Sequence, residues 1–275
     1  MPDEPNYTLG HGDRLVGAFG LRGVSHEAQF IVPYLRPGMS VLDCGCGPGT
    51  ITVGLAECVT PGRVVGVDIS GDQFDIDIGR KLAVQKGIAA IDFRQGDIAN
   101  LEFDDESFDV VVAHGVLYHL ADPQTALTEI HRVLIEDGLL GIRDTDEGGS
   151  LIGPADELVQ RCCAAVVEAW RLNGTDPFFG RRQLGVVRGA GFEPVHFSAS
   201  YDNYTSGAQT RGLAAFIAEL LRQPHMRDPL VNSGWTGPEE LHRMREAIAA
   251  WGSAEDAFYC RARCETVARK ALSSP

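Results

Sequence analysis

The chain has 275 residues, 44% of them hydrophobic and 23% charged, which is the range of an ordinary globular protein rather than a disordered or fibrous one. Its formal net charge of −14 argues against a nucleic-acid partner, because affinity for a phosphate backbone depends on basic side chains. No apolar run approaches the roughly 20 residues that span a bilayer, and residues 1–12 lack the pattern of a secretory signal, so we expect a cytoplasmic protein without a membrane partner.

The first 40 residues are expected to form an N-terminal lid that contains one helix, from Ser25 to Leu35, ended by Arg36-Pro37-Gly38. Residues 41–150 then alternate short, continuously apolar runs with helical patterns. Continuous apolar runs are typical of strands that are buried on both faces, as in a parallel sheet covered by helices. The predicted strands of this core are Val41–Leu42, Val64–Val67, Phe108–Ala113 and Leu139–Ile142, and the predicted helices are Thr50–Val59, Asp72–Lys86 and Pro123–Leu134.

These repeated strand–helix units predict an α/β fold with an open, doubly wound, mostly parallel sheet and right-handed crossovers. Residues 151–204 would complete this core with a long helix over 154–173 and a strand that ends near Tyr201. Residues 205–256, which prolines and glycines interrupt, are expected to form a helical lid insertion. Residues 257–275 would supply the last strand, over Ala257–Ala268, and a tail.

A glycine-rich turn, Gly45-x-Gly47-x-Gly49, follows the first predicted strand and leads into a helix. Glycine lets the backbone approach a ligand closely and adopt a positive φ. A loop at the carboxyl end of the first strand also lies beside the switch point of such a sheet, where ligands bind. Taken alone, the turn can also be a tight strand–helix connection. Thr50 stands where a dinucleotide fingerprint has its third glycine, which argues against a bound pyrophosphate.

An acidic residue, Asp68, ends the second predicted strand. A carboxylate at this point can accept hydrogen bonds from both hydroxyls of a ribose. The alternative is a structural carboxylate that caps the strand end. In combination with the glycine turn, Asp68 favours a nucleoside ligand without phosphates.

The motifs resemble those of class I S-adenosylmethionine-dependent methyltransferases, and within that superfamily the chain is similar to the small-molecule branch that includes ubiquinone and menaquinone biosynthesis methyltransferases. The resemblance covers residues 35–145. It implies S-adenosylmethionine as the cofactor and a Rossmann-like sheet of order 3-2-1-4-5-7-6 with helical lid additions. The residues that carry it are Asp43-x-Gly45-x-Gly47-x-Gly49, Asp68-Ile69, Gly96-Asp97-Ile98, and Phe108–Val111 followed by Leu117-Tyr118-His119-Leu120.

The resemblance implies that the glycine turn receives the methionine and ribose portions of the cofactor. Gly45, Gly47 and Gly49 would admit these groups. Asp43 would accept hydrogen bonds from the cofactor's ammonium group or from neighbouring amides. His114, at the end of the fourth strand, would contribute its backbone near the methionyl portion.

The same resemblance implies that three segments hold the adenosine. Asp68 would bind the ribose diol, and Ile69 would lie against the adenine. Asp97 and Ile98 would bracket the adenine ring, with the Asp97 side chain near its amino group. Gln73 would lie either close to the adenosine or on the outer surface of its helix.

Two residues that follow the fourth and fifth strands are candidate catalytic groups. Methyl transfer from a sulfonium is an in-line displacement, which needs a general base only if the nucleophile must lose a proton. His119 has an unperturbed pKa near neutrality, but it can equally pack against the following helix. Asp144 could act as a base, orient the substrate, or form a structural ion pair with Arg143.

The expected substrate is a small molecule with an O, N, S or C nucleophile, and at least one of Trp170, Phe178 and Phe179 is expected to line its pocket. Two other function classes stay open. The first is an NAD(P)-dependent oxidoreductase with a Rossmann fold, and the second is a catalytically inactive binding protein of methyltransferase fold. A homodimer is also left open.

The cysteines and basic residues carry no further function by their spacing. The seven cysteines lack the paired spacing of a zinc site and are odd in number, so we expect packed, free thiols and no metal centre. The basic residues form small groups that we interpret as solvated faces or one local anion site. These groups are Arg181–Arg182 and Arg261, Arg263, Arg269 and Lys270.

Overall fold

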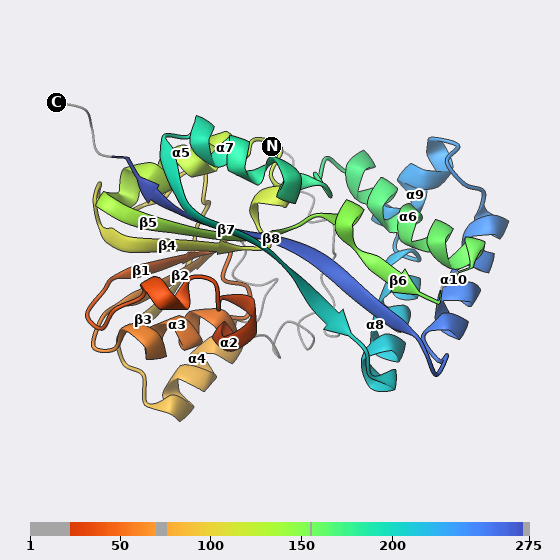
Figure 1. Cartoon of the computed structure of the whole chain (residues 1–275), viewed down its shortest axis with the longest axis horizontal. Coiled ribbons are helices and arrows are strands. Elements are labelled where there is room, and N and C mark those ends of the chain that lie inside the picture. The colour runs from red at the N-terminus through yellow and green to blue at the C-terminus, as the bar shows by residue number, and fades with distance from the viewer. Residues whose placement is uncertain (1–22, 70–75, 155, 272–275) are drawn as a thin grey trace.

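A sheet of eight strands runs through the computed structural model of the chain, which describes residues 23–69, 76–154 and 156–271 (Figure 1). Five strands are parallel and lie in the order β3 (Ile91–Gln95), β2 (Val64–Asp68), β1 (Val41–Cys44), β4 (Phe108–His114) and β5 (Leu134–Thr145).

The remaining three strands join this core through antiparallel pairs. β8 (Phe258–Lys270) runs against the direction of the core strands and pairs with β5 through residues 263–269, and β7 (Phe192–Tyr204) pairs with the other edge of β8. The short strand β6 (Leu151–Gly153) pairs with the beginning of β8. Without β6, the strands lie in the order β3-β2-β1-β4-β5-β8-β7. When these seven strands are numbered consecutively along the chain, this is the predicted order 3-2-1-4-5-7-6, so the predicted Rossmann-like α/β fold is confirmed.

Helices cover both faces of the parallel sheet, as Figure 1 shows. One face carries α5 (Pro123–Val133) and α7 (Gln183–Gly189), and the other carries α2 (Val24–Glu27), α3 (Thr50–Val59) and α4 (Ile76–Lys86). Neighbouring residues of one strand enter different cores. In β4, the side chain of Val111 packs in the hydrophobic cluster beneath α5, and that of Val110 packs in the cluster beneath α3. Both side chains are fully buried. This explains why the strands are continuously apolar.

A second group of helices packs at the far ends of β7 and β8 (Figure 1). We call α6 (Glu157–Leu172), α8 (Gly207–Leu220), α9 (Pro224–Asn232) and α10 (Pro238–Trp251) the cap. The cap has its own hydrophobic cluster, in which Trp170, Met226 and Met244 are buried. Since β7 and β8 each have 13 residues, they extend from the core sheet into the cap.

Local chemistry explains where the helices begin. The side chain of Asp122 accepts a hydrogen bond from the amide of Gln124 at 3.0 Å, and Pro123 is the first residue of α5, so this predicted helix start is confirmed. The predicted helix over Ser25–Leu35 is wrong. The chain instead forms α2 and a 3-10 helix, η1 (Val32–Tyr34), because Pro33 cannot donate an amide hydrogen bond within a longer helix.

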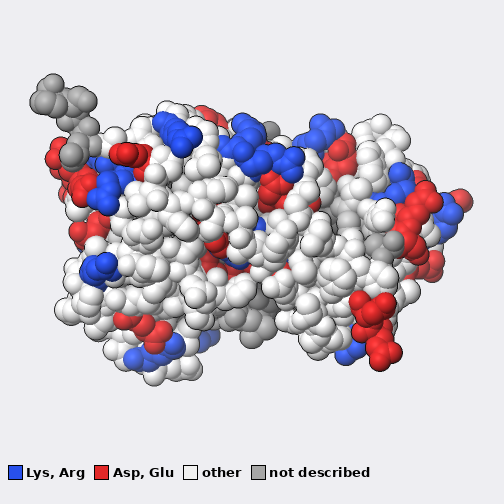
Figure 2. Space-filling model, in the orientation of Figure 1, with Lys and Arg blue, Asp and Glu red and all other residues white. Residues whose placement is uncertain are grey.

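Charged side chains lie around the rim of the face seen in Figure 2, where basic groups stand beside acidic ones and the middle is largely uncharged. No continuous basic surface forms on this face, as expected for a net charge of −14. Within the described ranges, none of the helices has both the length and the apolar composition needed to cross a bilayer.

Candidate active site

The glycine-rich turn lies at the carboxyl edge of the sheet, directly after β1. Its amides at Gly45 and Cys46 donate to the carbonyl of Val67, at 2.7 and 3.1 Å. Gly45 has φ +72°, and a Cβ there would lie 2.2 Å from the side chain of Val116. Gly49 has φ +76°, and a Cβ there would lie 2.5 Å from the ring of Phe93. Only glycine fits these two positions, so the turn keeps its backbone bare.

Asp68 is joined directly to this turn. The amide of Gly47, which has φ +52°, donates to Oδ2 of Asp68 at 2.9 Å. The carboxylate is only 6% exposed, so it does not face bulk solvent. The end of β2 and the turn after β1 therefore form one continuous edge, on which a ligand can contact both.

Asp43 lies beneath the turn rather than at its surface. It is buried, and its Oδ2 accepts a hydrogen bond from the hydroxyl of Thr52 at 2.7 Å. Burial raises the pKa of Asp43 to about 7, with Thr52 opposing the rise and the nearby charge of Asp68 adding to it. The carboxyl group is therefore partly protonated near neutral pH, and a positive group that approached it would favour its charged form.

The segments after β2 and β3 extend this edge. Ile69 is 47% exposed, and its carbonyl accepts a hydrogen bond from the side chain of Gln95 at 3.1 Å. Asp97 is exposed and accepts from the amide of Ala99 at 2.8 Å. The side chain of Ile98 is buried in the core beside the edge. Gln73, a predicted adenosine contact, lies outside the described residues.

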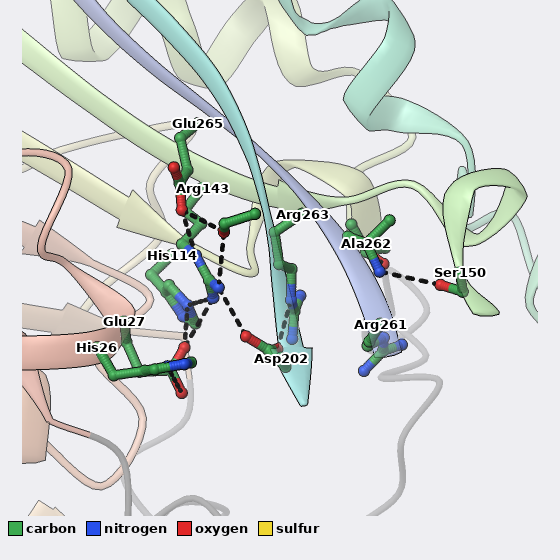
Figure 3. Close-up of polar contacts among 12 residues, drawn as sticks. His26, Glu27, His114, Arg143, Ser150, Asp202, Arg261, Ala262, Arg263 and Glu265 are labelled. Carbon is green, nitrogen blue, oxygen red and sulfur yellow. Dashed lines mark hydrogen bonds and ion pairs between the residues drawn. The ribbon is translucent and has the colours of Figure 1, made fainter. Parts of the chain in front are cut away.

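His114 ends β4, and its side chain enters a buried ionic network around Arg143 (Figure 3). The guanidinium of Arg143, 1% exposed, lies 2.7 Å from Glu27, 2.6 Å from Asp202 and 3.0 Å from Glu265. The imidazole Nε2 of His114 is 3.1 Å from both Glu27 and Arg143. This network joins α2 to the ends of β4, β5, β7 and β8.

The carboxylates of this network that could bind a metal are already paired with arginine. His26, Glu27 and Asp202 place possible ligand atoms within 4.8 Å of one another. However, Glu27 and Asp202 already bind the guanidinium of Arg143, and Asp202 also accepts from Arg263 at 2.7 Å. Although burial alone would raise it, Arg263 and Arg143 hold the pKa of Asp202 far below its usual value. Arginine therefore supplies the positive charge that this acidic group needs.

The interpretation of the C-terminal basic residues as solvated faces or an anion site is wrong for three of the four. Arg263 is 3% exposed and is paired with Asp202, and the side chain of Arg261 is 17% exposed and is paired with Glu147. Lys270 is 8% exposed and donates to the carbonyl of Leu134 at 2.7 Å. Arg269, by contrast, has a side chain that is 40% exposed and pairs with Asp137. Contacts with distant segments bury the other three side chains, which the local sequence does not reveal.

His119 belongs to a 3-10 helix, η2 (Leu117–His119), in the loop after β4. Its ring stacks on that of Tyr118, with centroids 3.8 Å apart. Burial, reinforced by the charges of Arg261 and Arg263, lowers the pKa of His119 to about 3. The imidazole is therefore neutral at physiological pH.

Asp144 follows Arg143 in β5 and points to the opposite face of the sheet. The alternative of an ion pair between these two neighbours is wrong, since Arg143 pairs with Glu27, Asp202 and Glu265 instead. Asp144 is fully buried, and burial raises its pKa to about 8. Arg263 and the backbone amides of residues 116–118 oppose this rise. No described group meets its oxygens with the geometry of an ordinary hydrogen bond.

Two of the three predicted pocket residues line a cavity of about 470 Å³ in the cap, namely Trp170 and Phe178. Phe179 is 1% exposed and packs in the core instead. Tyr204 also lines the cavity. All seven cysteines are free thiols, as predicted.

Comparisons with known proteins agree with this geometry. A family model described as a methyltransferase domain matches residues 35–176. The protein named "Probable methyltransferase ltbC", from Aspergillus luteorubrus, is 33% identical over 96% of this chain and 97% of its own length. The chain belongs to the methyltransferase family.

Other members match over shorter stretches or in fold alone. A demethylmenaquinone methyltransferase from Lactobacillus johnsonii is 36% identical over 41% of this chain and 46% of its own length. The crystal structure of the YcgJ protein from Bacillus subtilis has the same fold. It matches with a TM-score of 0.60 at 16% identity, over 90% of this chain and all of that one.

Membership of the family decides between the function classes. The protein is an S-adenosylmethionine-dependent methyltransferase, so the predicted activity and cofactor are confirmed. The alternatives of an NAD(P)-dependent oxidoreductase and of an inactive binding protein are set aside. The turn fits this cofactor, because three glycines without side chains follow β1 and lie directly beside the carboxylate of Asp68.

Sequence reasoning missed the ionic network around Arg143 and the carboxylate of Glu147. The partners of Arg143 come from positions 27, 114, 202 and 265, which no local pattern connects. Glu147 is half of an ion pair with Arg261, 114 positions later in the chain. The only available signal was the presence of charged residues in strands that were otherwise apolar.

Proposed function

We propose that this methyltransferase transfers the methyl group of S-adenosylmethionine to an O, N, S or C nucleophile of a small molecule, in biosynthesis or secondary metabolism. The observation that carries the proposal is the hydrogen bond from the Gly47 amide to Asp68. It joins the bare glycine turn and the strand-end acid into one edge, which is what an adenosyl ligand without phosphates requires.

The methionyl end of the cofactor is proposed to lie over the glycine turn. Gly45, Gly47 and Gly49 would allow its close approach, and His114 would contribute its backbone. Asp43, whose raised pKa reflects its burial, would be stabilised in its charged form by the cofactor's ammonium group or by nearby amides.

The adenosine is proposed to lie along the ends of β2 and β3. Asp68 would accept hydrogen bonds from the ribose hydroxyls. The exposed side chain of Ile69 would cover one side of the adenine, while Asp97 and Ile98 would border the other. Gln73 remains a predicted neighbour of the adenosine.

S-adenosylmethionine supplies a methyl group that is already activated, so the protein's task is to orient the acceptor and exclude water. Where the acceptor must lose a proton, we assign its removal to His119. Because burial holds the pKa of His119 at about 3, this role requires that the bound substrate and cofactor raise that pKa toward neutrality. Asp144 would then act through His119 rather than on the substrate. Its carboxyl group faces the amides of residues 116–118 and would hold η2 in place.

The acceptor is proposed to be a metabolite rather than a nucleic acid, because the net charge is −14 and the described basic residues are mostly paired with acids. The match to a demethylmenaquinone methyltransferase supports the predicted small-molecule branch. In this proposal residues 1–40 and 205–256 are lid segments over a cofactor-binding core at 41–150. Residues 257–275 and the part of 151–204 outside α6 complete that core, whereas the predicted assignment of α6 to the core is wrong, because α6 packs in the cap. A homodimer and a cytoplasmic location stay predictions.

Replacement of the strand-end acid tests the cofactor site. We expect Asp68→Ala to weaken the binding of S-adenosylhomocysteine by a factor of ten or more, measured by isothermal titration. Such a variant loses both the ribose contact and the hydrogen bond that holds Gly47. The matched control is Asp92→Ala, the same change at an exposed residue of the neighbouring strand β3, which should bind as the wild type does. Wild-type affinity in a folded Asp68→Ala protein would show that the assignment is incorrect.

A further inference from the structure

One edge of the sheet is a long strand, β7, whose outer side no described strand covers. β7 pairs with β8 alone, while β5 and β6 pair with the other side of β8. In an antiparallel pair, residues direct their amide and carbonyl groups alternately toward the neighbouring strand and away from it. About half of the backbone polar groups of β7 therefore lie on an open edge. Within the described ranges, no further backbone hydrogen bond reaches residues 193–203.

The two edges of the sheet differ in their resistance to the addition of another strand. At the opposite edge, β3 presents Asp92 and Arg94, an ion pair of 2.7 Å whose side chains are both about half exposed. Charged side chains of this kind protect an edge against pairing with another chain. In β7, residues 194–201 include no Lys, Arg, Asp or Glu. Pro194 and the adjoining bulge interrupt the strand only before His196, so a regular, uncharged edge follows them.

The same stretch of β7 carries exposed apolar side chains. Val195, Phe197 and Tyr201 are 45%, 42% and 40% exposed, and they are three of the seven large hydrophobic residues that are exposed among those described. Single exposed apolar residues are common on protein surfaces, whereas a group of them indicates a contact surface. A partner for this edge should therefore be apolar and able to add a strand.

The face around β7 is large enough for a stable interface. β7 has 13 residues, so at about 3.3 Å per residue it is about 43 Å long. A strip about 20 Å wide along it would bury roughly 800 Å² on each partner, which is the size of a standard interface. Figure 1 is viewed down the shortest axis of the chain, so β7 crosses one of its broad faces, and Figure 2 shows that the middle of this face is largely uncharged.

The sequence of β7 is complementary to a second copy of itself. A two-fold axis at Ala199 would run two copies of β7 antiparallel and place Phe197 of each copy beside Tyr201 of the other. Cross-strand pairs of aromatic side chains stabilise antiparallel sheets. Ala199 is exposed, and its small side chain permits close approach at the axis. Two-fold symmetry is also the commonest arrangement of identical chains.

The two ends of β7 carry opposite charges. Glu193 lies near the start of β7 and Arg211 near the beginning of α8, which follows β7, and both are exposed. Nη1 of Arg211 lies 3.0 Å from the position of a Cβ on Gly207, so this guanidinium is close to the end of β7. Arg269, which faces Glu193 across the strand pair, binds Asp137 instead. In the part of the chain that the structure describes, neither Glu193 nor Arg211 has an ion-pair partner, and an antiparallel second copy would bring the two together.

We propose that the β7 edge is a homodimer interface, in which two copies of β7 pair antiparallel about a two-fold axis at Ala199 and join the two sheets into one. A second copy is favoured over another protein because this edge supplies both halves of the aromatic and ionic contacts. The inference goes beyond the proposed function and does not depend on it. In the sheet, β4, β5 and β8 separate β7 from β1, β2 and β3, which carry the cofactor edge.

Sedimentation velocity of the full chain tests the interface. At micromolar concentrations we expect a species with about twice the 29.7 kDa mass of one chain. Phe197→Lys and Tyr201→Lys, at exposed positions where folding should be unaffected, should each raise the dimer dissociation constant about tenfold or more, because lysine on an edge strand opposes pairing. The matched control, Val84→Lys, changes an exposed apolar residue of α4 and should leave the dimer intact. A monomeric wild type, or β7 lysine variants that associate as the wild type does, would overturn the inference.

Two further sets of variants locate the axis and the direction of pairing. Glu193→Arg and Arg211→Glu should each weaken the dimer, and the double variant should regain most of the lost affinity, because each reversed charge again meets an opposite one. Ala199→Cys should form a disulfide between chains on mild oxidation, since opposite Cβ atoms lie about 5 Å apart in such a pair. Ala249→Cys, the same change at an exposed residue of α10, should not. A double variant that dimerises no better than the single ones, or equal crosslinking of the two cysteine variants, would contradict the antiparallel arrangement.

Cofactor binding separates this inference from the proposed function. The β7 lysine variants should bind S-adenosylhomocysteine as the wild type does, and Asp68→Ala should remain a dimer. A wild type that binds S-adenosylhomocysteine but stays monomeric would overturn only the interface. One that dimerises through β7 but does not bind S-adenosylhomocysteine would contradict the cofactor site instead.

Discussion

His119 and Asp144 lie at the ends of adjacent strands, and burial acts on them in opposite directions. Burial disfavours the charged form of each group. It therefore lowers the pKa of the imidazole to about 3 and raises that of the carboxyl group to about 8. At neutral pH both side chains are mainly uncharged. This is consistent with an enclosed reaction space in which the sulfonium of the cofactor is the reactive charge.

The first prediction at this scale concerns the protonation of His119. In the folded protein its Cε1 proton resonance should not titrate between pH 5 and pH 8, because the ring stays neutral throughout this range. Proton nuclear magnetic resonance will check this, with His119→Asn used to assign the signal. In the urea-unfolded chain the same histidine should titrate near its ordinary pKa of about 6.5. A folded-state midpoint above pH 5 would contradict the conclusion that burial and the two arginines keep the imidazole neutral.

The second prediction concerns Asp144 and stability. Its folded-state pKa of about 8 exceeds the unfolded value of about 4, so the native state holds its proton more tightly over this interval. The stabilisation is complete below pH 4 and is lost as the pH rises toward 8. This one group makes the free energy of unfolding fall by at most about 1.4 kcal/mol per pH unit. In Asp144→Asn that contribution should be absent, as urea denaturation at a series of pH values will measure.

The comparison needs a matched variant, since Asp43 also has a raised pKa and gives a slope of the same sign up to about pH 7. Asp256→Asn, the same change at an exposed position, should parallel the wild-type curve. The decisive quantity is the difference in slope between Asp144→Asn and Asp256→Asn. Identical slopes for the two variants would mean that Asp144 is ionised in the folded protein and does not hold η2 as a neutral group.

At the scale of elements, the sequence predicts best what is buried on both faces or capped by its own residues. The predicted helix Thr50–Val59 has the bounds of α3, and Pro123–Leu134 differs from α5 by one residue. The four predicted core strands are all present, although β5 begins at Leu134 instead of Leu139. In each case the determinants are local, either a continuous apolar run or a cap.

Elements that depend on distant partners were not predictable in this way. β3 is an edge strand in which only Phe93 is buried, so its sequence shows no continuous apolar run. β6 has three residues and exists because β8 pairs with it. The helix expected over Ser25–Leu35 had a suitable pattern, but it is interrupted before Pro33.

The candidate site also has parts that depend on local sequence and parts that depend on distant partners. The glycine turn and Asp68 follow strands in the sequence, so their meeting at one sheet edge could be predicted, and the Gly47–Asp68 hydrogen bond agrees with it. The cavity in the cap could be predicted only as far as Trp170 and Phe178, because its polar wall joins Glu147 to Arg261. Such a pairing is a property of the tertiary fold and not of any local spacing.

At the scale of the whole molecule, one buried guanidinium holds segments from both ends of the chain. Arg143 binds Glu27 of α2, Asp202 of β7 and Glu265 of β8, while it is itself part of β5. The hydroxyls of Ser198 and Ser200 also donate to Glu265, at 2.7 and 2.6 Å. The network thus fixes the paired strands β7 and β8, which extend into the cap, against β4 and β5 of the core sheet.

The last prediction follows from the number of carboxylates around this arginine. Arg143→Met fills most of the same space but leaves Glu27, Asp202 and Glu265 without their shared cation. Removing one partner of a buried ionic group destabilises proteins by about 3–5 kcal/mol, because the remaining charge stays buried. The control, Arg171→Met, removes an exposed arginine that pairs with Glu168 of its own helix, and this variant should unfold at nearly the wild-type urea concentration.

The difference in stability between Arg143→Met and the wild type should also shrink below about pH 4. The pKa values of Asp202 and Glu265 are lowered in the folded wild type, so the stability that these carboxylates contribute is present above their unfolded values and is lost as the pH falls. A loss of stability that is small, or that is independent of pH, would mean that the network is dispensable for joining the cap to the core.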